Sequence, residues 1–190
     1  MLATSCLFFM ISGIQFWVTD YMKFALQMKD ETAYICYILT AITAPFMGVL
    51  CGGAATQMVG GYKSPNALKM LTLVALTGTA VAIPLPLLNS HKAYLALFWM
   101  CLFLGGFINP GLTGYMIHDA PKKEWRIGNS IALFSYNVLG YIPGPFLYGY
   151  LSTKTHHTSV LPMSVLTYSL VLAFVLLLIA CVSIHDKAGS

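Results

Sequence analysis

Charged residues are rare in this sequence. Only 8% of its 190 residues are Asp, Glu, Lys or Arg, whereas about 25% is typical of soluble globular domains. Hydrophobic residues make up 58%, and the mean hydropathy is +0.76. A helix needs about 20 mostly apolar residues to cross the hydrocarbon core of a bilayer. The composition therefore excludes an ordinary soluble domain and predicts an integral, multi-pass membrane protein surrounded by a lipid bilayer.

The sequence also lacks the patterns that bind metals, phosphates or nucleic acids. Its five cysteines all fall in apolar stretches at no metal-like spacing: Cys6, Cys36, Cys51, Cys101 and Cys181. No phosphate-binding glycine loop is present. The net charge of +4 is spread over separate loops. We therefore expect no cofactor, no metal and no nucleic-acid partner.

Apolar stretches of membrane-spanning length account for most of the chain. They predict an all-α protein with one six-span domain over residues 1–190, with spans at about 2–26, 33–58, 66–88, 93–118, 128–151 and 160–184. The first run has no basic residue before it and is longer than a secretory signal, so we expect it to be retained. The connections are short, and Gly60, Gly61 and Pro65 mark one of them.

The basic residues predict the orientation of the spans. Six lie in the loops after the second and fourth spans or in the tail, namely Lys63, Lys69, Lys122, Lys123, Arg126 and Lys187. Four lie on the other side, namely Lys23, Lys29, Lys92 and Lys154. Cytoplasmic loops carry an excess of Lys and Arg. Both termini are therefore predicted to face the cytoplasm or its equivalent.

Polar side chains are concentrated in the first, fourth and fifth predicted spans. In a membrane bundle such residues face the interior or a water-filled cavity. The third and sixth spans are more uniformly apolar, which suits an outer, supporting position.

Glycine and proline gather in the second and fifth predicted spans. Gly48 and Gly52 follow Pro45, while Gly140 and Gly144 flank Pro143, with Pro145 beyond. Small residues four apart let helices approach closely. Interruptions at corresponding positions of two repeats also point to transporter architecture. The second and fifth spans correspond if the fold is two three-helix repeats. The alternative is close packing with no role in transport.

Other six-span classes require motifs that this sequence does not contain. An aquaporin needs two Asn-Pro-Ala caps, but only Asn109-Pro110-Gly111 is present. A rhomboid-type protease needs a serine paired with a histidine on a later helix, and the fifth and sixth spans contain no histidine. Mitochondrial carriers repeat a proline, acid and base motif three times, and no copy occurs. We expect no enzymatic activity.

Three segments resemble parts of one transporter family. The loop at 53–63, with Gly53, Gly60, Gly61 and Lys63, resembles the glycine-rich basic loop of the major facilitator superfamily, although Gln57 stands where that motif usually has aspartate. The segment 126–149 resembles the eleventh helix of such transporters. The stretch 13–21 is similar to their seventh helix, especially in spinster-like members. The order of these segments extends the resemblance over nearly the whole chain.

The resemblance implies the carboxyl-terminal six-helix half of such a transporter. The first and fourth spans are then the cavity helices, and the second and fifth move during alternating access. The residues expected along the substrate path are Gln15, Trp17, Asp20, Asn109, Asn137 and Tyr141. Asp20 is a candidate to bind a cation or a proton. Its alternative is a simple ion pair with Lys23, three residues on.

A complete transporter of this type holds its substrate between two six-helix halves, and this chain supplies one. The resemblance thus predicts transport of a small organic solute by alternating access, with a second six-span half as partner, either another chain or a second copy. The alternative is a transporter-derived structural or accessory subunit of a larger membrane assembly, with no transport activity.

Overall fold

The chain folds into a bundle of helices. The computed structural model describes residues 1–62, 64–119, 125–155 and 158–189, and no strand occurs among them. In chain order the elements are α1 (Leu2–Phe24), α2 (Asp30–Met58), α3 (Pro65–Ala82), the 3₁₀ turn η1 (Leu85–Leu87), α4 (His91–Asp119), α5 (Trp125–Tyr136), the π-helical segment η3 (Asn137–Tyr141), α6 (Pro143–Thr155) and α7 (Leu161–Gly189).

Five of the predicted spans correspond to single helices, or to a helix and its short extension. The stretches Leu2–Phe24, Asp30–Met58, Pro65–Leu87, His91–Tyr115 and Leu161–Ser183 are long and apolar enough to cross a membrane. These five helices indicate a multi-pass membrane protein in a lipid bilayer. The membrane-protein class and the all-helical fold predicted from the sequence are thereby confirmed.

The fifth predicted span differs, because it consists of three consecutive segments, α5, η3 and α6. Pro143 has no backbone N–H to donate, so it cannot continue the α-helical pattern of hydrogen bonds. The preceding residue, Ile142, donates its N–H to the Asn137 carbonyl over 3.0 Å, five residues back. That bond closes a π-helical turn. None of the three segments alone is long enough to span a bilayer.

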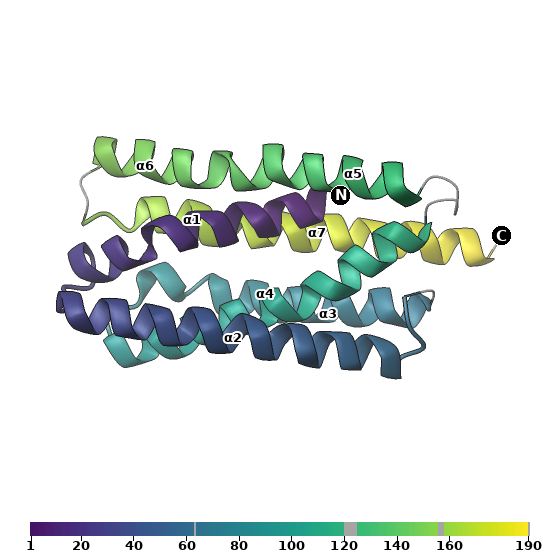
Figure 1. Ribbon diagram of the computed structural model, residues 1–190, viewed down its shortest axis with the longest axis horizontal. Helices are drawn as coiled ribbons and strands as arrows, with labels where there is room; N and C mark the ends of the chain where they lie inside the picture. Colours follow the sequence, from purple (N-terminus) through teal and green to yellow (C-terminus); the bar gives the residue numbers. More distant parts are fainter. Residues whose placement is uncertain (63, 120–124, 156–157, 190) are drawn as a thin grey trace.

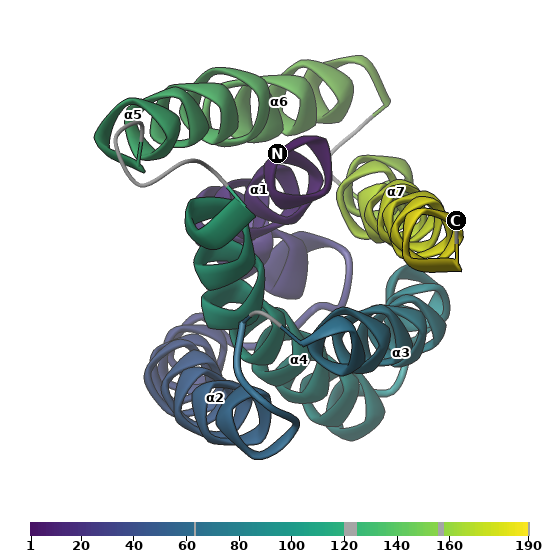
Figure 2. The same cartoon turned by 90° about the vertical axis from the view of Figure 1, so that its right-hand side faces the viewer.

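Helices α1 and α4 lie inside the bundle (Figures 1 and 2). Half of the residues in the apolar stretch of each are buried, compared with 22% for α2. In the end-on view α5 and α6 form one side, α2 lies on another, and α3 and α7 pack together on a third (Figure 2). Both termini lie at the same end (Figure 1).

Glycines set the contact between α2 and α4. A Cβ atom on Gly48 would overlap the Phe103 carbonyl oxygen, and one on Gly52 would overlap that of Phe107. In return, a Cβ on Gly106 of α4 would lie 2.7 Å from the Pro45 carbonyl oxygen. The two backbones therefore touch along a parallel crossing that no larger residue permits.

The crossing between α1 and the fifth span has the same construction. A Cβ on Gly140 would lie 2.5 Å from the Ser5 carbonyl oxygen, and one on Gly144 would overlap the Phe9 carbonyl oxygen. Contact positions increase together on both helices, so this crossing is parallel too. The four glycines that the sequence assigned to helix packing, together with Pro45, therefore lie at these two crossings.

Helix α7 is tied to its neighbours by side-chain hydrogen bonds to backbone carbonyls. Ser169 donates to the Cys6 carbonyl over 3.2 Å, and Thr79 of α3 donates to the Leu170 carbonyl over 3.2 Å. Near the other end of α1, the Tyr21 hydroxyl donates to the Pro86 carbonyl over 2.9 Å. Hydrogen bonds of this kind add to van der Waals packing, which dominates helix association in a membrane.

Replacing Gly52 with alanine is expected to destabilise the bundle by about 1–3 kcal/mol, because the new methyl group meets the rigid backbone at Phe107. The adjacent Gly53 is the matched control. A Cβ there meets nothing within 4 Å, so Gly53→Ala should leave stability unchanged or raise it by up to about 1 kcal/mol. Thermal unfolding of detergent-solubilised protein measures both. Equal effects at the two positions would contradict the crossing described above.

Two buried tyrosines should respond differently to loss of their hydroxyl groups. Tyr94 is fully buried, and its hydroxyl has no hydrogen-bond partner in the part of the chain that the structure describes. Tyr94→Phe should therefore be neutral or stabilising, whereas Tyr21→Phe removes the bond to Pro86 and should cost about 1 kcal/mol. The same unfolding measurement separates the two. A larger loss for Tyr94→Phe would rule out an unpaired hydroxyl.

Candidate functional site

A cavity of about 210 Å³ lies between α1, α2 and α4. Most of its wall is apolar, and its polar side chains are Gln15, Tyr37 and Asn109. None of its lining residues carries a charge. The lining residues are Phe8, Met10, Ile11, Ile14, Gln15, Tyr37, Ala41, Pro45, Val49, Leu102, Gly105, Gly106 and Asn109.

Gln15 connects three elements at this cavity. The Tyr141 hydroxyl of η3 donates a hydrogen bond to Gln15 Oε1 over 2.5 Å. The Tyr37 hydroxyl of α2 donates to the Gln15 backbone carbonyl over 3.3 Å. Gln15 on α1 thus accepts one bond from each of two helices that lie on different sides of it. Among the described residues its amide nitrogen, a donor group, has no partner.

Asn109 brings a further amide to the cavity from α4. Its Oδ1 lies 3.5 Å from the Thr113 hydroxyl, one helical turn on. Pro110 follows it within the same helix and cannot donate a backbone hydrogen bond. Asn109 is therefore a half-buried polar group beside an interruption of the backbone hydrogen-bond pattern.

Aromatic rings flank the cavity on the side of the fifth span. Phe8, which lines the cavity, stacks on Tyr136 with ring centroids 4.3 Å apart. The Tyr141 ring lies 6.1 Å from Phe8 in a tilted arrangement. Such pairs are favourable beyond the apolar area that they bury. The site therefore combines amide and phenol groups with a rigid aromatic wall.

Trp17 lies on a different side of α1 from this cavity. Its indole N–H donates to the Pro145 carbonyl over 3.0 Å, and its ring stacks on Tyr148 with centroids 5.4 Å apart. These contacts fix α1 against α6. Trp17, predicted as a wall of the substrate path, is here a packing residue of the α1–α6 contact.

Asp20 is partly exposed near the carboxyl end of α1, and it does not line the cavity around Gln15. Lys23, considered from the sequence as its partner, forms an ion pair with Asp30 instead, with Nζ and Oδ2 3.3 Å apart. The ammonium group also lies over the rings of Phe24 and Tyr34. Lys23 therefore ties the end of α1 to the start of α2.

Asn137 begins the π-helical segment and is exposed. Its amide nitrogen donates to the Leu133 carbonyl over 2.7 Å, so the side chain bonds to its own helix. It lies four residues before Tyr141 without contributing to the cavity wall. The structure thus brings Gln15, Asn109 and Tyr141 together and leaves Trp17, Asp20 and Asn137 apart from them.

The residues of the predicted cytoplasmic loop motif lie at the end of α2 and in the turn after it. Gly53 and Gln57 belong to α2, and Gly60 and Gly61 have positive φ angles of 104° and 75°. Such angles end a helix readily only at glycine. Lys63 lies outside the described residues. The motif glycines therefore have a structural explanation in reversing the chain before α3.

Sequence reasoning missed Tyr37, which lines the cavity and bonds to Gln15. The second predicted span was interpreted from its glycines and proline, and a tyrosine near its start resembles an interfacial anchor. Only the packing of α1 against α2 directs that ring toward Gln15.

Comparison of the chain with family models, with curated proteins and with solved structures finds no match.

A double-mutant cycle tests the bond between Gln15 and Tyr141. Gln15→Ala and Tyr141→Phe should each destabilise the protein, and together they should cost about 1 kcal/mol less than the sum of their separate effects. Tyr136→Phe is the control, because Tyr136 stacks on Phe8 and makes no bond to Gln15. Combined with Gln15→Ala it should be additive. Additivity in both cycles would show that the Gln15–Tyr141 bond contributes nothing.

Proposed function

We propose that this chain is one half of a major facilitator type transporter that moves a small organic solute by alternating access. The observation that carries the proposal is the meeting of Gln15, Tyr37 and Asn109 at one cavity, with Tyr141 bonded to Gln15. Polar groups inside membrane spans are costly, and they commonly mark a substrate pathway. Here they come from elements in both halves of the chain.

The helix crossings support two three-helix repeats, α1 to α3 and α4 to α7. In each repeat the second span offers two glycines, four residues apart, to two backbone carbonyls of the other repeat's first span. Gly48 and Gly52 meet Phe103 and Phe107, while Gly140 and Gly144 meet Ser5 and Phe9. An odd number of spans per repeat inverts the second repeat relative to the first, as in many transporters.

Two further glycine contacts also join the first span of each repeat to a span of the other repeat. A Cβ on Gly13 of α1 would meet Leu166 of α7, and one on Gly111 of α4 would meet Leu71 of α3. Thus each first span packs its glycine against a leucine of a third span. This agreement favours a repeated unit over a chance arrangement of helices.

Interruptions at matching places supply the points of bending. Pro45 lies inside α2, and the π-helical segment Asn137–Tyr141 followed by Pro143 lies inside the fifth span. Both lie beside the glycine crossings and beside the polar cluster, which consists of Gln15, Tyr37, Asn109 and Tyr141. Since Pro45 lines the cavity and Tyr141 bonds to Gln15, bending at either place changes the site.

A second candidate function is a structural subunit, which is favoured by the surface of α2. Large apolar side chains cover its outer face, with Ile42 66% and Phe46 65% exposed. Lipid, a second transporter half or a subunit of a larger assembly would each cover such a face. The polar cavity distinguishes transport, because a purely structural role gives the amide groups no solute to bind.

Cysteine labelling tests alternating access directly. In a variant whose five native cysteines are replaced by alanine, Gln15→Cys should react with a membrane-impermeant maleimide from either side of the membrane. Phe16→Cys is the control. Both side chains are exposed, but Phe16 does not line the cavity and lies on the apolar surface, so it should react poorly. A transported solute should reduce labelling of Gln15→Cys by about tenfold at saturation.

Two outcomes would contradict transport. Equal labelling at positions 15 and 16, or labelling that no solute in a broad panel changes, would favour the structural role. The native mass of the complex, extracted gently from its membrane, provides the second readout. One additional six-span chain fits a transporter, whereas a large multi-subunit assembly fits an accessory subunit.

A further inference from the structure

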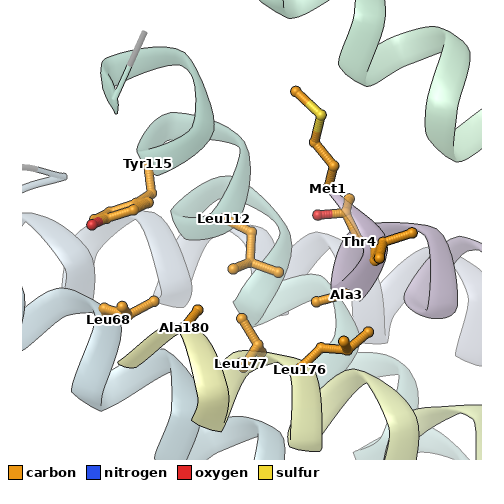
Figure 3. Close-up of a pocket in the computed structure, with 10 residues that line it drawn as sticks. Met1, Ala3, Thr4, Leu68, Leu112, Tyr115, Leu176, Leu177 and Ala180 are labelled. Atoms are coloured by element: carbon orange, nitrogen blue, oxygen red, sulfur yellow. The ribbon is translucent and has the colours of Figure 1, made fainter. Parts of the chain in front are cut away.

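A second cavity lies far from Gln15, at the end of the bundle where α1 and α3 begin (Figure 3). Its volume is about 460 Å³, and α1, α3, α4 and α7 all contribute to its wall. Ala3, on the wall, precedes Gln15 by 12 positions of α1, which corresponds to about 18 Å along a helix axis. The two cavities are therefore separate sites.

The inner wall of this second cavity is aliphatic. Ala3, Leu68, Leu112 and Leu177 are only 3% to 8% exposed, so they form a buried floor. Figure 3 shows Leu112 of α4 and Leu177 of α7 pointing toward each other from opposite sides. The remaining wall includes Thr4, Tyr115 and Met1, whose amino group is partly buried. An occupant that reaches the floor would therefore meet methyl and methylene groups, while its outer part would lie beside these polar groups.

The size of the cavity matches a ligand and not a packing defect. Ligand pockets have volumes of about 300–1,000 Å³, whereas one water needs only about 10–15 Å³. Water is a poor occupant here, because a buried water needs two to four polar partners and the floor supplies none. An apolar occupant restores the dispersion contacts that unfilled space would lose.

The position of this cavity in the bundle indicates which kind of apolar molecule fits it. Ala3 is in the first turn of α1 and Leu68 in the first turn of α3, so the cavity adjoins the ends of two predicted spans. The ends of spans lie near the interface between hydrocarbon and headgroups. A lipid at that level can place its tail against the buried leucines while its headgroup stays in the interface.

We propose that this cavity binds one acyl chain of a membrane phospholipid. The proposal does not depend on transport, because the site shares no residue with the cavity around Gln15. A bound chain would fill the space between α4 and α7 and join their ends to the start of α1.

Photolabelling in vesicles tests this site. The full chain is reconstituted in phosphatidylcholine vesicles that contain a phosphatidylcholine with a diazirine near the end of one acyl chain. After irradiation, labelled residues are mapped by mass spectrometry. Leu112 and Leu177 should be labelled although both are buried. Ala180→Phe, which fills the cavity, should lower that labelling by about tenfold, equivalent to about 1.4 kcal/mol of binding free energy.

Ala54→Phe is the matched control. Ala54 is exposed on α2 and lies away from the cavity, so the same substitution there should leave labelling of Leu112 and Leu177 unchanged. Ala3→Leu fills the cavity from α1 and provides a second variant if Ala180→Phe does not fold. Gel filtration identifies the folded variants.

A parallel reaction with a diazirine-bearing free fatty acid distinguishes two sources of the acyl chain. Labelling of the buried leucines by the phospholipid probe, lost in both cavity-filling variants, supports the proposal. Labelling by the fatty acid alone overturns the assignment to a phospholipid. Labelling restricted to exposed positions such as Leu172, or equal labelling of the buried leucines in wild type and filled variants, overturns the site itself.

Discussion

The bundle depends on two places where helix backbones touch. In a bilayer, burying apolar side chains against one another gains little over burying them in lipid, so close packing must hold the helices. Gly48 and Gly52 provide it for α2 and α4, and Gly140 and Gly144 provide it for α1 and the fifth span. The second crossing holds α1 against the fifth span, and α1 also packs against α2. Tyr37 and Tyr141 then reach the same glutamine.

Much of the fold follows from patterns that the sequence displays directly. Apolar runs of sufficient length predict five of the helices to within a few residues, because lipid requires each span to satisfy its own backbone. The interruption of the fifth span was less predictable. Pro143 signals a change in hydrogen bonding, but whether the helix kinks, breaks or forms a π turn depends on packing against α1. The proline alone does not choose among these.

The candidate site was also only partly predictable, because sequence patterns are local whereas the site depends on how the helices pack. Gln15 and Asn109 stood out because amides are rare in apolar spans, and both line the cavity. Trp17 stood out as a candidate ring for the cavity wall and Asp20 as a carboxylate near the membrane, but both lie elsewhere. Residue type does not reveal which side of a helix meets which neighbour. Lys23 illustrates this further: spacing along α1 suggested Asp20, whereas the turn into α2 brings Asp30 within 3.3 Å.

The π-helical segment also changes which residues share a side of the helix. Residues five apart in an α-helix are separated by about 140° around its axis, so one partner ring would not contact both. Across η3, however, Tyr136 and Tyr141 both contact Phe8, with ring centroids 4.3 Å and 6.1 Å away. The extra residue in the π turn rotates the residues that follow it around the helix axis. It lets one stretch of chain present two tyrosines to α1 while its glycines still face the same helix.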